Sequence, residues 1–123
     1  MNTLQSFFIG LVALIHIYIL ILEMVLWTKP KGIKTFGLKS KEYAEETKIL
    51  AANQGLYNGF LAAGLIWSLL DSSYGNNIAI FFLACVTLAG FYGSYSTKNI
   101  RIFYVQAIPA IIALILTLLK TYN

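Results

Sequence analysis

Four long apolar runs alternate with polar stretches along the chain. The runs cover residues 4–27, 48–70, 78–96 and 102–119. A bilayer core about 30 Å thick is spanned by roughly 20 apolar residues in a helix, and each run is near that length. A helix satisfies its backbone hydrogen bonds internally, as lipid requires. The pattern therefore predicts an all-α membrane protein, with four transmembrane helices in an antiparallel bundle.

The composition agrees with the pattern. Hydrophobic residues make up 59% of the 123 residues and charged residues only 11%, whereas soluble domains are about half apolar and a quarter charged. A chain of this length predicts one domain, so we expect residues 1–123 to form a single polytopic membrane domain. One cysteine, Cys85, excludes an internal disulfide and a multi-cysteine metal site. The residues indicate no metal ligand and no particular cofactor.

Basic residues are concentrated in two of the three connecting loops. The third loop holds Lys98 and Arg101, the second loop has Asp71 as its only charge, and the first loop holds Lys29, Lys31, Lys34, Lys39 and Lys41, with Lys48 at its end. The positive-inside rule places loops one and three in the cytoplasm and both termini outside the cell membrane. Because the charges lie between apolar runs, we expect a lipid bilayer as the partner and no nucleic acid.

The first loop also contains a signal for the start of a helix. The loop opens with the turn residues Pro30 and Gly32. Ser40 then precedes a helical run with Glu42 in its first turn, a sequence typical of a capped helix start. We therefore expect the second helix to begin near Ser40 in the cytoplasm and to continue into the membrane. Within the fourth span, Pro109 predicts a kink.

Polar residues inside the apolar runs are the candidates for function. In the first run, His16 and Glu23 lie seven residues apart, which places them on one helix face, about 10.5 Å apart along the axis. Ionisable residues in a membrane are costly to bury and are therefore functional candidates. Glu23 is expected to pair with Arg101 or to accept hydrogen bonds from amides, and it could carry a proton.

The second run carries a polar arc beside an arc of small residues. Asn53, Gln54, Tyr57 and Asn58 cover about 140° of a helix, at 100° per residue. Gly55 belongs to the neighbouring arc, together with Ala51, Gly59 and Ala62, which permits the close approach of another helix. Interhelical hydrogen bonding alone could explain the amides, and a ligand site is the alternative.

In each of the four predicted spans, polar residues fall in the half that lies nearer to the cytoplasm. Counted at 1.5 Å per residue, they lie about 6–15 Å from the inner interface. Either a polar cavity open to the cytoplasm or a dense hydrogen-bonded core fits this distribution. The predicted ligand-binding residues are Glu23, Asn53, Gln54, Tyr57, Asn58, Tyr92, Arg101 and Gln106, with His16, Lys48 and Tyr95 as a second group.

Three stretches carry a resemblance to a known family. "EMVLWTKPKGIKTFGL", "LAANQGLYNGFLAAGL" and "YGSYS" resemble small bacterial integral membrane proteins of the domain of unknown function 1304. This resemblance implies a four-span membrane protein and no particular activity. A weaker similarity, carried by Lys48, Asn53 and Tyr57, is to membrane-associated eicosanoid and glutathione metabolism proteins, although Leu56 stands where that family has an acidic residue. It implies a trimer with active sites between subunits.

Three functions remain open on the sequence. The first is a membrane protein that binds a small polar or amphiphilic ligand, or a lipid, in the cytoplasmic half. The second is a membrane enzyme of the glutathione or lipid-metabolism type, in which Tyr57, Tyr92 or Arg101 activates the substrate and Glu23 acts as acid or base. The third is a structural subunit whose polar residues hold helices together. A homo-oligomer, dimer or trimer, is compatible with each, and whether the protein is an enzyme is left open.

Overall fold

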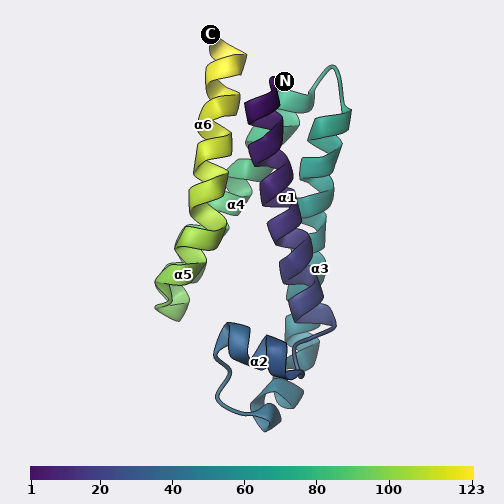
Figure 1. The fold of residues 1–123 in the computed structure, drawn as a ribbon, viewed down its shortest axis with the longest axis vertical. Helices are drawn as coiled ribbons and strands as arrows, with labels where there is room; N and C mark the ends of the chain where they lie inside the picture. The colour runs from purple at the N-terminus through teal and green to yellow at the C-terminus, as the bar shows by residue number, and fades with distance from the viewer. The chain divides into compact units, whose positions relative to one another are not determined.

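The computed structural model describes residues 1–123, and all of its regular secondary structure is helical (Figure 1). This confirms the all-α prediction. The helices are α1 (Thr3–Met24), α2 (Pro30–Phe36), α3 (Lys41–Leu70), α4 (Gly75–Thr97), α5 (Ile100–Ile102), the π-helix η1 (Phe103–Ala107) and α6 (Ile108–Tyr122). The chain divides into two compact units. Unit 1 contains Met1–Ile15 and Leu61–Asn123, and unit 2 contains His16–Phe60.

Three helical segments are long and apolar enough to cross a membrane: Thr3–Met24, Gly75–Thr97 and Ile100–Tyr122. They correspond to the first, third and fourth predicted spans. The second apolar run belongs to α3, whose charged start and internal amides lower its mean hydropathy. The chain therefore has the character of a membrane protein, while the fourth crossing, the bundle and the cytoplasmic extension of α3 stay predictions.

The connection between α1 and α3 contains a helix that the sequence analysis did not expect. The amides of Val25 and Leu26 both donate to the carbonyl oxygen of Ile21, and α1 ends at Met24. Pro30 then occupies the start of α2, where its missing N–H costs nothing. Gly37 ends α2 in the left-handed region with φ of 61°, a conformation that favours glycine. The Pro and Gly signals thus bound a short helix rather than an irregular loop.

The start of α3 confirms the predicted helix cap. The helix begins at Lys41, and the backbone N–H of Tyr43 donates to the Ser40 hydroxyl oxygen at 3.0 Å. This bond satisfies one of the amide donors that a helix start leaves unpaired. α3 then runs unbroken for 30 residues.

Within unit 2, the small residues of α3 let α1 approach closely. A methyl group added at Gly55 would lie 2.7 Å from Cγ of Met24 and 3.0 Å from Cβ of Glu23. One added at Gly59 would lie 2.6 Å from a methyl carbon of Leu20. At Gly55 the contacts include the Cβ of Glu23 and the backbone oxygen of Leu20, which cannot turn away, so this position favours glycine, whereas at Gly59 the end of the Leu20 side chain would have to move. The predicted role of the small-residue arc is confirmed.

Unit 1 has its own apolar core. The core draws residues from α1, α3, α4 and α6: Ile9, Val12, Ala13, Leu65, Ala79, Leu83, Val86, Ala110 and Ala113. α4 also packs against η1, where a methyl group at Gly90 would lie 2.8 Å from Cβ of Ala107. Because Pro109 has no N–H, it cannot donate to the Val105 carbonyl. The π-helix occupies the turn just before this proline, at the place where the sequence predicted a kink.

Candidate functional site

The best-defined polar contact among the predicted site residues joins α1 to α3. Asn58 Nδ2 donates to Glu23 Oε1 at 2.6 Å, and it also contacts the backbone oxygen of Gln54 at 3.2 Å. The side chains are buried, with Glu23 3% and Asn58 9% exposed. A hydrogen bond to a carboxylate is about twice as strong as one between neutral groups. One of the two partners predicted for Glu23, an amide donor, is therefore present, and both residues lie within unit 2.

The tight approach of the two helices positions this pair. Gly55 faces the backbone of α1 next to Glu23, and Asn58 follows three residues later on α3. His16 is also buried, at 1% exposed. The prediction that His16 and Glu23 share one face of α1 agrees with the burial of both side chains.

The polar arc of α3 does not act as one surface in the structure. Asn53, Gln54 and Tyr57 are exposed, and Asn53 Nδ2 donates to the backbone oxygen of Ile49 in its own helix at 2.9 Å. Tyr57 is 60% exposed, and its ring lies 6.2 Å from the ring of Phe60. The reason is the rotation of α3. Because the small-residue arc faces α1, only the neighbouring edge of the polar arc, Asn58, is buried.

A shallow groove lies on the surface of unit 2, next to the residue that follows Glu23 in the chain. Its volume is about 380 Å³, and its walls are Met24, Lys48, Ile49, Ala52, Asn53 and Leu56. We call it the α1–α3 groove. Four of these residues are apolar, while Lys48 and Asn53 supply an ammonium group and an amide. The volume lies at the lower end of the range of about 300–1,000 Å³ that is usual for small-molecule sites.

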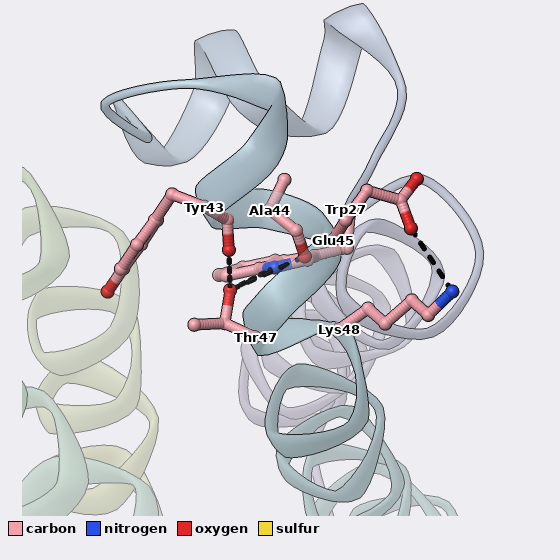
Figure 2. A network of polar contacts seen from close by, with 6 residues as sticks. All are labelled: Trp27, Tyr43, Ala44, Glu45, Thr47 and Lys48. Atoms are coloured by element: carbon pink, nitrogen blue, oxygen red, sulfur yellow. Dashed lines mark hydrogen bonds and ion pairs between the residues drawn. The ribbon is translucent and has the colours of Figure 1, made fainter.

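Two sets of polar contacts lie near the start of α3, and Lys48, which lines the groove, belongs to one of them (Figure 2). Lys48 Nζ lies 3.1 Å from a carboxylate oxygen of Glu45, and both side chains are about half exposed. Such a pair holds weakly in water, so Lys48 can exchange Glu45 for another anion. At the residue before Lys48, Trp27 Nε1 donates to the Thr47 hydroxyl at 3.0 Å, and that hydroxyl donates to the Tyr43 backbone oxygen at 2.7 Å.

The other predicted residues lie in unit 1. Tyr92 and Tyr95 near the end of α4 are 71% and 81% exposed, Arg101 in α5 is exposed, and Gln106 in η1 is half-buried. Their convergence with Glu23 stays a prediction. In the chain as a whole, no group of three or more His, Cys, Asp or Glu side chains is arranged to hold a metal ion.

Sequence reasoning missed a second buried polar cluster, in unit 1. Gln5 Nε2 donates to Asn76 Oδ1 at 2.9 Å and to the Thr117 hydroxyl at 3.3 Å. Gln5 and Thr117 are completely buried. The cluster joins α1, α4 and α6. The only available signal was a single glutamine near the start of an apolar run, which has no characteristic spacing.

Comparisons with known proteins identify relatives of this chain. The family model described as "Protein of unknown function (DUF1304)" matches residues 10–118, a range that contains both Glu23 and Asn58. The chain is 36% identical over 107 residues to the uncharacterised protein YpaA of Lactococcus lactis subsp. lactis (strain IL1403). The aligned residues cover 85% of this chain and 88% of YpaA. No solved structure matches the chain. The weaker similarity to eicosanoid and glutathione metabolism proteins stays a prediction.

Proposed function

The chain belongs to the DUF1304 family of proteins of unknown function, and we propose that it is a small integral membrane protein that binds an amphiphilic ligand in the α1–α3 groove. The observation that carries this proposal is the make-up of the groove. Met24, Ile49, Ala52 and Leu56 give it an apolar wall, and Lys48 places a cation at it. A ligand with a hydrocarbon chain and an anionic head group matches both features.

The Glu23–Asn58 bond supports the proposal through the position of the groove wall. Met24 follows Glu23 in the chain, and its Cγ lies against Gly55 of α3. The hydrogen bond between Glu23 and Asn58 holds this part of α1 on α3. A wall formed by two helices that are fixed in this way loses little conformational freedom when a ligand binds.

The test uses the full-length protein in lipid nanodiscs with two photoreactive probes, a diazirine-bearing palmitic acid and the corresponding neutral alcohol. Mass spectrometry then maps the labelled peptides. We expect the acid to label the segment from Ile49 to Leu56. Ala52→Phe fills the groove and should lower this labelling about tenfold or more, because the phenyl ring takes the volume of the chain. Lys48→Gln should lower labelling by the acid about fivefold, as expected for one lost charge contact of about 1 kcal/mol.

The matched control is Ala63→Phe, a change of the same size at an exposed position of α3 outside the groove. It should leave labelling unchanged, and Lys48→Gln should leave labelling by the alcohol unchanged. Equal labelling of the Ala52→Phe and Ala63→Phe variants would show that the probe reacts with the lipid-exposed surface of the helix and would refute the proposal.

A second candidate is the membrane enzyme of the glutathione or lipid-metabolism type, with sites between subunits. The exposure of Tyr57, Asn53 and Gln54 on the single chain favours it. Polar groups at membrane depth are costly to leave in lipid, and a second copy in a dimer or trimer would cover them. Retention on immobilised glutathione together with an oligomeric mass in detergent would support this candidate, whereas no retention and a monomeric mass would exclude it.

A further inference from the structure

The helix α2 and its flanks carry an uncompensated basic surface. Residues 28–41 contain five lysines and no acidic residue, and all five side chains are exposed: Lys29, Lys31, Lys34, Lys39 and Lys41. The one ion pair in the structure, Lys48–Glu45, involves none of them. Lys39 makes its contact with an aromatic face, 4.8 Å from the centre of the Tyr43 ring. Five positive charges therefore fall within 14 residues, and none of them forms an ion pair. We call this the α2 basic surface.

The α2 basic surface is held in a fixed place. α2 is amphipathic, since Gly32 is buried and Phe36 half-buried, whereas Lys31 and Lys34 are exposed. A methyl group at Gly32 would overlap the carbonyl of Leu26, so α2 touches the chain that leaves α1. The rings of Trp27 and Phe36 lie 5.0 Å apart.

Trp27 also ties α2 to α3. Its indole nitrogen bonds to Thr47, as Figure 2 shows. The lysines consequently project from an ordered element and not from a mobile tail, so less conformational entropy is lost when they meet an anion.

The place of this surface in the chain favours lipid head groups as its partner. α1, one of the three segments able to cross a membrane, ends at Met24, and α2 begins six residues later at Pro30. Trp27 lies between them, and indole rings concentrate at the boundary between hydrocarbon and head groups. A basic surface beside the end of a span faces lipid head groups. Each lysine near an anionic bilayer contributes about 1 kcal/mol to binding, and this contribution falls off within a Debye length.

We propose that the α2 basic surface, centred on Lys31 and Lys34, is a docking surface for the head groups of anionic phospholipids. It is separate from the α1–α3 groove, which takes a single ligand along an apolar wall and uses Lys48. The α2 basic surface selects instead among the lipids of the surrounding bilayer. The charge of the head group decides this selection, and the hydrocarbon chains do not.

The chain provides its own reporter for a test. It has two tryptophans, so Trp67→Phe leaves Trp27, beside α2, as the single fluorophore. The protein is reconstituted in vesicles that contain brominated phosphatidylglycerol or brominated phosphatidylcholine at equal mole fraction, and quenching of Trp27 is measured. We expect stronger quenching by phosphatidylglycerol. In the Lys31→Gln/Lys34→Gln variant, the preference for this lipid should fall by up to about 30-fold, the equivalent of about 1 kcal/mol for each lysine.

The matched control is Lys98→Gln/Lys120→Gln, which removes the same charge from exposed positions elsewhere in the chain and should keep the preference. The emission maximum of Trp27 verifies that α2 stays folded on α3. Equal quenching by both lipids in the parent protein would overturn the proposal, as would an unchanged preference in the Lys31→Gln/Lys34→Gln variant. Loss of the preference on adding inorganic phosphate, compared with chloride at the same ionic strength, would assign the surface to a soluble anion and would also overturn it.

Discussion

Single side chains of similar chemistry have different roles in this protein. Asn53 and Asn58 are both amides on α3, five residues apart. Asn58 donates to the buried carboxylate of Glu23, while Asn53 is exposed and bonds to its own helix. An unpaired buried polar group costs far more than an exposed one, because water cannot replace the missing partner. Burial and partner therefore decide what each amide contributes, and residue type does not.

This contrast gives a prediction at the residue scale. Asn58→Leu should lower the free energy of unfolding by about 1–3 kcal/mol, since Glu23 loses its amide donor while remaining buried. Asn53→Leu should change it by less than about 0.5 kcal/mol. Equilibrium unfolding in mixed detergent micelles, followed by helical circular dichroism, measures both. An equal loss in the two variants would mean that the amides act alike.

At the scale of helices, glycines decide which elements can approach one another. Gly55 and Gly59 permit the contact of α3 with α1 within unit 2, and Gly90 permits that of α4 with η1 within unit 1. A Cβ added at any of these glycines would lie 2.6–2.8 Å from the nearest atom of the neighbouring helix. The contact at Gly90 involves the backbone nitrogen and Cα of Ala107, which cannot rotate away as a flexible side chain could.

A pair of glycine variants tests this role. Gly90→Ala should destabilise the protein by about 1–3 kcal/mol, because the added methyl forces α4 and η1 apart. A Cβ added at Gly10 meets no atom within 4 Å. Gly10→Ala should therefore stabilise α1 by up to about 1 kcal/mol, because alanine has the higher helix propensity. Thermal unfolding of the two variants should shift in opposite directions. A gain of stability for Gly90→Ala would show that α4 and η1 are not in close contact.

At the scale of the whole molecule, the number of crossings sets the topology. Three segments have the length and hydropathy of spans, and α3 has the length but carries amides and charges. Four crossings place both termini on one side of the membrane, whereas three place them on opposite sides. The positive-inside rule favours four, with the lysine-rich connection in the cytoplasm.

Cysteine labelling measures this directly. In a Cys85→Ala background, single cysteines replace Asn2, Lys34, Ser73 and Tyr122, all exposed positions. In intact cells, a membrane-impermeant maleimide should label positions 2, 73 and 122 but reach position 34 only after permeabilisation. If positions 2 and 122 label from opposite sides, α3 does not cross the membrane.

Several local features could be predicted because they depend on neighbours in the chain. The Ser40 cap depends on a residue three positions away, and the close approach at Gly55 follows from spacing along one helix. α2 was missed because Pro30 and Gly37, which bound it, are also turn residues. The bond between Gln5 and Thr117 joins residues 112 positions apart, and no local pattern indicates such a pair.

By itself, the sequence determined where the long apolar helices lie, how α3 begins, and that this chain carries polar groups within apolar segments, since these follow from hydropathy and from contacts over one or two turns. Only the tertiary structure decided which amide meets Glu23. Asn53, Gln54 and Asn58 were equal candidates on one arc, and the rotation of α3 that buries Gly55 against α1 selected Asn58. Rotation about a helix axis depends on the fit of two surfaces, and a single helix carries only one of them.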